Sequence, residues 1–217
     1  MSFSDLTFLF YFLPLFFAVY YLVPFRFKNA ALVLGSAAFY FLGASVRDCL
    51  LLLASVLFHY ALARGMEGRA QGARKALLLF GLCADLFGLV YFKYAAFLLE
   101  NLGRLVGREF TLVHLALPLG ISFYLFQSAG YLIDVYRGGQ AERNLIDFTA
   151  FVLAFPQLTM GPILRYDEWR GALKERTIAR GDVFLGFERF VAGLCFKVLL
   201  ADQLAPLWAS LERIGYG

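Results

Sequence analysis

The sequence predicts an all-α fold, a polytopic bundle of transmembrane helices, from three observations. Hydrophobic residues make up 61% of the chain and charged residues only 17%, whereas soluble domains are roughly half apolar and a quarter charged. The apolar residues gather into charge-poor stretches, several of about 17 to 25 residues, the length with which a helix crosses a bilayer. Phe and Tyr number 25 and 12 of 217 residues, as expected where rings lie at bilayer interfaces and pack between helices.

About five membrane spans are predicted, since each needs a long charge-poor stretch. Residues 6–23, 76–99 and 111–133 are long enough by themselves. Residues 30–46 and 49–63 are shorter and are expected to span if they are tilted or packed in a bundle. The first stretch lacks the basic residues and cleavage site of a signal peptide, so we expect it to stay as a membrane helix.

The distribution of Lys and Arg predicts that the N-terminus lies outside. Basic residues are retained on the cytoplasmic side of membrane helices. With the N-terminus outside, the outer segments carry only Arg47, Arg104 and Arg108, and most other basic residues fall on the inner side. The chain after Arg137 then begins on the cytoplasmic side.

Residues 117–138 are apolar enough to cross a bilayer, yet they contain helix breakers and hydrogen-bonding side chains. Pro118 and Gly120 are expected to interrupt the helix near its start. At helical spacing one face carries a polar stripe: Gly120, Tyr124, Gln127, Tyr131 and Asp134. Because lipid offers these groups no hydrogen-bond partners, the stripe is expected either to line a substrate funnel or to hold helices together.

A broken segment follows this span. Residues 147–155 are apolar but too few to cross a bilayer. The helix breakers Pro156, Gly161 and Pro162 come next. A re-entrant or interfacial loop is therefore predicted at the cytoplasmic face, with its backbone shielded by protein.

The last part of the chain is predicted to stay on the cytoplasmic side. The charged residues 166–182 are expected to form a solvated loop. Residues 183–204 carry a helical stripe of apolar side chains interrupted by charges, which predicts an amphipathic helix that is interfacial or partly buried.

The two histidines are not predicted to be catalytic. His59 lies inside an apolar stretch without an acidic or serine neighbour, which favours a helix-packing or capping role. His114 is expected near the outer end of the fifth span. Asp85 lies near the middle of the fourth span, where a carboxylate is costly unless it is paired or hydrated, so it is either a link between helices or part of a substrate path. Lys93, flanked by aromatic residues, is expected to extend toward the interface.

The basic residues that follow the polar span offer two interpretations. Asp134 and Arg137 are three positions apart in the sequence and are expected to pair on the helix surface. Arg137, Arg143 and Arg165 together would also suit a phosphate-bearing cytoplasmic donor. No metal site is predicted, because the cysteines stand singly. No nucleotide-binding loop or serine-hydrolase motif is found either.

At these residues the sequence resembles the membrane-bound O-acyltransferase family. Within it, the chain is most similar to the bacterial branch of the alginate O-acetyltransferases and the D-alanyl transfer proteins of teichoic acid synthesis. The motifs that carry the resemblance are Leu117-Pro-Leu-Gly-Ile-Ser-Phe-Tyr-Leu-Phe-Gln-Ser, Tyr131-Leu-Ile-Asp-Val-Tyr-Arg, Asn144-Leu-Ile-Asp-Phe, Phe155-Pro-Gln-Leu-Thr-Met-Gly-Pro-Ile-Leu-Arg, Tyr91-Phe-Lys-Tyr and Lys197-Val-Leu-Leu-Ala-Asp, with the opening Phe8-Leu-Phe-Tyr-Phe-Leu-Pro-Leu-Phe.

The resemblance covers nearly all of this chain but about half of the family's usual length. It implies a single acyltransferase domain of which residues 1–217 form the N-terminal part, with transmembrane helices in 1–136 and a cytoplasmic loop, a re-entrant segment and an amphipathic helix in 137–217. The family's catalytic His stands in a Trp-His-Gly context, which this sequence lacks. The chain alone is therefore expected to be inactive.

The resemblance also implies a reaction and its participants. An acyl group, expected to be acetyl, passes from acetyl-coenzyme A or an acyl carrier protein in the cytoplasm to hydroxyl groups of a cell-surface polysaccharide such as alginate. The resemblance further implies a multi-pass protein of the bacterial inner membrane that works with a periplasmic esterase-like partner. It implies no bound cofactor and no nucleic acid. The candidate funnel residues are Tyr124, Gln127, Tyr131, Asp134, Arg137, Gln157 and Arg165.

Two other functions stay open. A small transporter or channel-like subunit would also contain broken spans and polar stripes. A non-catalytic membrane scaffold that holds a partner acyltransferase is the other possibility.

Overall fold

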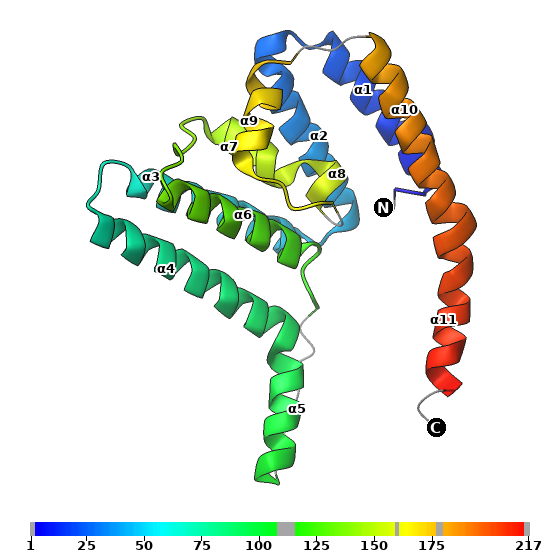
Figure 1. Cartoon of the computed structure of the whole chain (residues 1–217). Coiled ribbons are helices and arrows are strands. Elements are labelled where there is room, and N and C mark those ends of the chain that lie inside the picture. Colours follow the sequence, from blue (N-terminus) through cyan, green and yellow to red (C-terminus); the bar gives the residue numbers. More distant parts are fainter. Residues whose placement is uncertain (1–2, 108–115, 159–160, 177–179, 215–217) are drawn as a thin grey trace. The chain divides into compact units, whose positions relative to one another are not determined.

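The computed structural model describes residues 3–107, 116–158, 161–176 and 180–214, and every regular element in these ranges is a helix (Figure 1). The chain divides into two compact units. One comprises Val19–Leu173, and the other comprises Met1–Ala18 with Lys174–Gly217. The all-helical class predicted from the sequence is confirmed.

The unit Val19–Leu173 contains most of the helices and the hydrophobic core. Its helices are α2 (Lys28–Gly43), α3 (Val46–Met66), α4 (Gln71–Leu89), α5 (Ala95–Val106), α6 (Ile121–Tyr136), α7 (Leu145–Leu153), α8 (Phe155–Leu158) and α9 (Tyr166–Lys174). A 3-10 turn, Phe25–Phe27, precedes α2, and a π-helical turn, Val90–Tyr94, joins α4 to α5.

Three of these helices, α3, α4 and α6, pack side by side, while α2 packs on α7 and α8 (Figure 1). Helix α7 also contacts α3 and α6, so one continuous core joins the two groups. Gly81 of α4 lies at a close crossing, because a Cβ there would come within 2.6 Å of Leu132 on α6 and 2.9 Å of Leu62 on α3. Small residues allow helices to approach closely, which is how membrane helices gain contact area.

Local sequence fixes several helix ends. Ser45 and Asp48 form a capping box at the start of α3. The Asn144 side chain accepts a hydrogen bond from the Ile146 N–H at the start of α7. Helix α6 begins after Gly120, whose φ of 69° is left-handed. The predicted break at Gly120 is confirmed, whereas residues 111–115 of the span predicted at 111–133 lie outside the described ranges.

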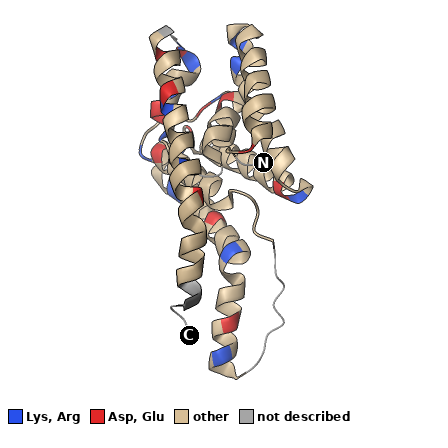
Figure 2. Ribbon diagram, turned by 90° about the vertical axis from the view of Figure 1, so that its right-hand side faces the viewer, with Lys and Arg blue, Asp and Glu red and all other residues tan. Residues whose placement is uncertain are grey.

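Two helices are long and apolar enough to cross a membrane, judged by length and composition: Val46–Met66, and the continuous helix Gln71–Val106. Phe8–Leu22 is a shorter apolar helix. Figure 2 shows long stretches of helix without charged residues. The spans predicted at 49–63 and 76–99 lie inside the two long helices. The count of about five spans and the outward N-terminus stay predictions.

The other unit contains the chain ends. A π-helical turn, Phe8–Phe12, leads into α1 (Leu13–Leu22), whose last residues belong to the first unit. Near the C-terminus, α10 (Arg180–Cys195), a π-helical turn (Phe196–Ala201) and α11 (Asp202–Ile214) follow one another directly. The helix predicted at 183–204 thus lies within a longer helical run.

One prediction for the region after α8 is wrong. The charged residues 166–182, expected to be a solvated loop, begin with helix α9. Tyr166 and Leu173 on one face of α9 are buried, and Trp169 packs against the same core. Apolar residues at this helical spacing bury one side of α9 while its charges stay outside.

Candidate functional site

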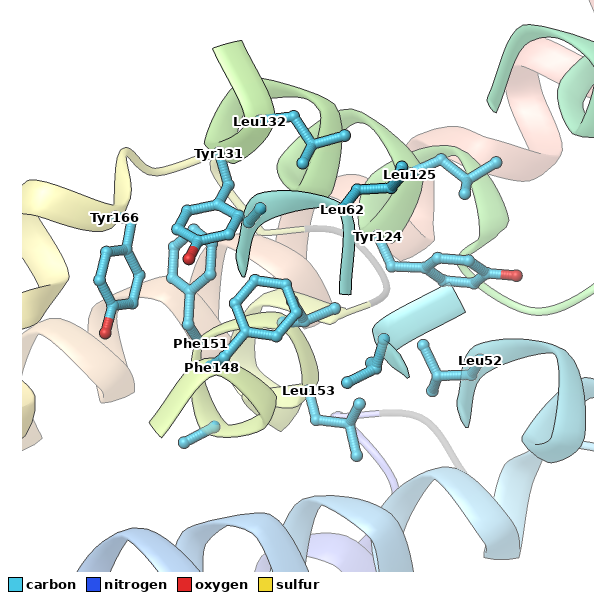
Figure 3. Close-up of a cluster of buried hydrophobic side chains, with 14 of the residues drawn as sticks. Leu52, Leu62, Tyr124, Leu125, Tyr131, Leu132, Phe148, Phe151, Leu153 and Tyr166 are labelled. Atoms are coloured by element: carbon cyan, nitrogen blue, oxygen red, sulfur yellow. The ribbon is translucent and has the colours of Figure 1, made fainter. Parts of the chain in front are cut away.

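The polar stripe of α6 reaches several different neighbours. The Gln127 amide donates to the Phe151 carbonyl of α7 at 2.7 Å. The Tyr131 hydroxyl accepts a hydrogen bond from the Glu142 N–H at 2.8 Å. Tyr124, 2% exposed, points away from Tyr131 toward the region of Leu52 (Figure 3). Gln127 therefore links α6 to α7, and Tyr131 links α6 to the loop before α7. Whether the stripe also lines a funnel stays a prediction.

Glu142, which the sequence analysis did not single out, is the centre of a buried cluster with Tyr131 and Tyr166. Its Oε2 accepts a hydrogen bond from the Tyr166 hydroxyl at 2.6 Å. Its Oε1 accepts from the N–H groups of Arg143 and Asn144 at 2.9 and 3.0 Å. The rings of Tyr131 and Tyr166 also meet edge to face, 5.2 Å apart (Figure 3). Glu142 thereby contacts α6 through its backbone N–H, and its carboxylate joins the loop before α7 to α9.

The electrostatics of this cluster favour a neutral Tyr166. Burial is the largest cause that raises the pKa of Tyr166, and the hydrogen bond to Glu142 and the negative charge of Glu142 raise it further. The hydroxyl therefore stays a donor to Glu142, and the cluster is a stable structural link in the described part of the chain.

Asp134 and Arg165 are brought together by the fold. The Nη2 and Nε atoms of Arg165 lie 2.9 and 3.3 Å from the two oxygens of Asp134. This geometry corrects the expectation that Asp134 pairs with Arg137, whose side chain is exposed. A hydrogen bond to Asp134 is the largest cause that raises the pKa of Arg165. The planar guanidinium favours such two-point contacts with a carboxylate.

The end of α6 that carries Asp134 is strongly basic. Arg74 of α4 donates to the carbonyls of Val135 and Tyr136 at 2.7 and 2.8 Å, where a cation complements the C-terminal end of the helix dipole. The Tyr60 hydroxyl donates to the Arg143 carbonyl and ties the loop before α7 to α3. Exposed basic residues at this end form what we call the basic rim: Arg69, Lys75, Arg137 and Arg143. Guanidinium and ammonium groups in this arrangement can bind a phosphate-bearing molecule.

The remaining candidates lie in or beside α8. The Gln157 Oε1 is buried and has no hydrogen-bond partner among the described residues. Gly161 lies so close to α8 that a Cβ would come within 2.3 Å of the Gln157 Cα. Pro156 lies inside α8, and the break between α7 and α8 falls at Ala154. Pro118 is fully buried and Pro162 is exposed. Whether these residues line a funnel stays a prediction.

A second polar pair, also unexpected from the sequence, joins α3 to α4. His59 Nε2 lies 3.0 and 3.1 Å from the two carboxylate oxygens of Asp85, and both residues are buried. His59 Nδ1 also lies 2.7 Å from the Ser55 carbonyl oxygen and 3.3 Å from the Ser55 hydroxyl. The expectation that His59 has no acidic or serine neighbour is therefore wrong. The signal in the sequence was Asp85 itself, since a carboxylate inside an apolar span needs a partner on a neighbouring helix.

The chain is similar over nearly its whole length to several curated bacterial proteins. It is 43% identical to the probable alginate O-acetylase AlgI of Azotobacter vinelandii, over 95% of this chain and 43% of the relative. With the same-named protein of Pseudomonas aeruginosa it is 43% identical, over 95% of this chain and 41% of the relative. The peptidoglycan O-acetyltransferase of Helicobacter pylori is 32% identical to this chain, over 94% of this chain and 45% of the relative.

These matches confirm the resemblance to bacterial O-acyltransferases predicted from the motifs. The chain spans less than half the length of each of the three relatives. No family model matches the chain, and no solved structure does.

Proposed function

We propose, from the premise that this chain is a homologue of the alginate O-acetylases over nearly its whole length, that it forms the N-terminal part of a membrane-embedded O-acetyltransferase. The observation that carries the proposal is the identity of 41–44% with several proteins named alginate O-acetylase. The relative named peptidoglycan O-acetyltransferase supports the same reaction with another polymer. The two long apolar helices agree with a membrane protein.

In the proposed reaction, a hydroxyl oxygen of the polysaccharide attacks the carbonyl carbon of an acetyl thioester. The carbon–sulfur bond breaks, the thiolate leaves, and the hydroxyl proton is taken by a general base, for which an imidazole is well suited. We propose that this base lies in a Trp-His-Gly segment of the complete enzyme. His59 stands in Phe58-His59-Tyr60 and its two ring nitrogens are already engaged. This chain by itself is then inactive.

The role proposed for the described helices is to receive the donor. The donor is acetyl-coenzyme A or an acyl carrier protein, and both carry a phosphate next to the pantetheine arm. The basic rim at the end of α6 supplies cations for that phosphate. Asp134 and Arg165 hold the segment before α9 against α6 beside this rim. Tyr124, Gln127, Tyr131, Arg137 and Gln157 complete the proposed funnel.

The proposal places the protein in the inner membrane, crossing it several times, with its N-terminus outside and the basic rim in the cytoplasm. Transfer to the polymer then uses a periplasmic esterase-like partner. A scaffold role would need a separate catalytic subunit, and a transporter role would need substrate uptake. The names of the relatives favour acetyl transfer over both.

A chimera tests the proposal. The segment of the Pseudomonas aeruginosa relative that aligns with this chain is replaced by the chain, and the gene is expressed in a strain that lacks the relative. Alginate from this strain is expected to regain O-acetyl groups, measured by NMR of the purified polymer. The same strain expressing this chain alone is expected to produce none.

Membrane insertion of both proteins is checked by fractionation and immunoblotting. An inserted chimera that restores no acetylation contradicts the proposed function. Acetylation by the chain alone contradicts its proposed inactivity. Solute uptake by proteoliposomes of the purified chain, without any acetyl transfer, would support the transporter instead.

A further inference from the structure

The buried pair of His59 and Asp85 determines where its hydrogens lie. His59 Nδ1 lies 2.7 Å from the Ser55 carbonyl oxygen. A carbonyl oxygen can only accept a hydrogen bond, so Nδ1 must carry a hydrogen and donate it. The Ser55 hydroxyl, at 3.3 Å from the same nitrogen, is the longer contact.

The other ring nitrogen faces a second acceptor. Nε2 lies 3.0 Å from one oxygen of Asp85 and 3.1 Å from the other. A bare Nε2 beside an ionised carboxylate would place lone pairs against lone pairs in a buried site, at a high cost. A proton must therefore lie between them, either on Nε2 as part of an imidazolium or on Asp85 as a carboxylic acid. In both arrangements the pair is neutral overall and holds one proton more than a neutral imidazole and a carboxylate.

This arrangement does not activate a serine. In a Ser-His-Asp triad the histidine nitrogen that faces the serine must be free to accept the hydroxyl hydrogen. His59 Nδ1 instead donates to the Ser55 carbonyl. The Ser55 hydroxyl is therefore not activated as a nucleophile. The imidazole and the carboxylate hold a proton between them and do not take one from a serine.

A third helix brings a polar group to the same level. A Cβ at Gly81 of α4 would contact Leu132 of α6, and a Cβ at Gly88 would contact Leu125. Helices α4 and α6 are therefore antiparallel, with Gly81 opposite Leu132 and Gly88 opposite Leu125. In this register Asp85 of α4 lies at the level of Ser128 of α6. The Ser128 hydroxyl is 0% exposed and has no hydrogen-bond partner in the described part of the chain.

The other ionisable groups around the pair lie toward the start of α6. The phenol of Tyr124 on α6 lies within electrostatic reach of Asp85 and of Asp48 on α3. Asp48 pairs at 3.6 Å with Arg47. Among the described residues, His59 is the only basic group within ion-pair distance of Asp85, so the imidazole is its charge-balancing partner.

We propose that His59 and Asp85 form a proton-binding site inside the helical bundle, which keeps one proton shared between Nε2 and the carboxylate. His59 of α3 and Asp85 of α4 are both buried. With the shared proton the pair carries no net charge, so the bundle does not bury an uncompensated charge. The proposal is independent of the acetyltransferase function.

Nitrogen NMR on ¹⁵N-histidine-labelled protein in lipid nanodiscs tests this site. The sequence has two histidines, so H114Q leaves His59 as the single imidazole. At pH 8 an ordinary exposed histidine has one protonated and one bare ring nitrogen. In the H114Q protein we expect Nδ1 to be protonated and the Nε2 signal to lie at the protonated position or to be shifted toward it, because the second proton is on Nε2 or is donated to it by Asp85. An Nε2 signal at the position of an ordinary unprotonated ring nitrogen overturns the proposal.

Variants at Asp85 provide the matched comparison. In H114Q/D85L the Nε2 loses its partner, and the bare-nitrogen signal is expected to appear. In H114Q/D85N the Asn amide can donate to Nε2, so the fold is expected to persist while the shared proton is lost and the Nε2 signal moves toward that of an ordinary acceptor. An Nε2 signal identical in H114Q and H114Q/D85N contradicts the shared proton.

Thermal unfolding in detergent gives a second readout. H59L leaves a buried carboxylate and D85L leaves a buried imidazole, so each is expected to lower the Tm by several degrees. The double variant H59L/D85L removes both polar groups and is expected to regain most of that loss. A double variant no more stable than the weaker single variant overturns the coupling between the two residues.

Discussion

Asp134 and Arg165, 31 positions apart, meet through two contacts of 2.9 and 3.3 Å at the basic end of α6. The Arg165 side chain is 63% exposed and that of Asp134 14%. An ion pair this open is screened by water and salt, so it contributes little to stability. Its consequence is therefore mainly geometric, because it fixes the position of the segment that precedes α9.

The first prediction concerns that pair. D134N and R165Q are expected to change the Tm by no more than a few degrees, because the pair is exposed, yet to reduce acetylation by the chimera at least several-fold. The charge-reversed double variant D134R/R165D is expected to recover part of the loss. R143Q removes one cation of the basic rim but leaves the ion pair intact, so any loss of acetylation in R143Q reports on the rim and not on the pair. If the chimera with D134N acetylates alginate fully, the Asp134–Arg165 pair is not part of the proposed donor site.

The second prediction concerns Glu142. In E142A the buried Tyr166 hydroxyl loses its acceptor, which costs about 1–3 kcal/mol, and the N–H groups of Arg143 and Asn144 lose theirs. E142A is therefore expected to unfold well below the wild type in thermal scans, whereas Y166F, which removes one donor, has a smaller effect. A double-mutant cycle of the two variants should give a coupling energy clearly different from zero. Additive effects would mean that Glu142 and Tyr166 do not interact.

The third prediction compares two glycines. G161A places a Cβ within 2.3 Å of the Gln157 Cα, and backbone atoms cannot move away cheaply. Gly171 of α9 has no atom within 4 Å of its added Cβ, so G171A is expected to be neutral or to stabilise the helix by up to about 1 kcal/mol. Yield and Tm of the two purified variants test the difference. Equal stabilities would contradict the close approach at Gly161.

The fourth prediction concerns the contact between α2 and α7. The Asn29 amide donates to Asp147 at 2.7 Å, and Asp147 is buried. N29D sets two carboxylates against each other, which disfavours the charged form of both. N29D is therefore expected to be destabilised at pH 8 and to regain stability as the pH is lowered and one carboxyl group is protonated. N29S, which keeps a donor without the charge, is expected to lack this pH dependence.

The fifth prediction tests orientation. In a variant without Cys49, Cys83 and Cys195, single cysteines replace Arg104 or Arg143. A maleimide that does not cross membranes is expected to label R104C in intact spheroplasts and R143C only after permeabilisation. The reverse pattern would place the N-terminus in the cytoplasm.

The sequence predicted the elements of the fold better than their contacts. Helix α6 could be placed because Gly120 interrupts the chain and the apolar residues that follow keep helical spacing. Helix α9 was missed because its charges lower its hydropathy, although Tyr166, Trp169 and Leu173 stand at the spacing of one helix face. A count of charges alone does not distinguish a solvated loop from a short amphipathic helix.

The polar contacts could be predicted only in part. Periodicity placed Gln127 and Tyr131 on one face of α6, but their partners, Phe151 and Glu142, depend on how α7 and its preceding loop pack. His59 and Asp85 meet because α3 and α4 are antiparallel and in one particular register. Neither register nor packing angle is encoded in a local pattern, so such partners could not be found by reading along the chain.

The continuous helix Gln71–Val106 contains 36 residues, which at 1.5 Å per residue corresponds to roughly 54 Å. The hydrocarbon layer of a bilayer is about 30 Å thick. The π-helical turn at Val90–Tyr94, where α5 bends away from α4 (Figure 1), offers a way to relieve this hydrophobic mismatch, because it lets the two halves adopt different tilts. Lys93 lies within this turn. The bend angle is therefore expected to depend on acyl-chain length, making membrane thickness itself a determinant of the shape of this helix.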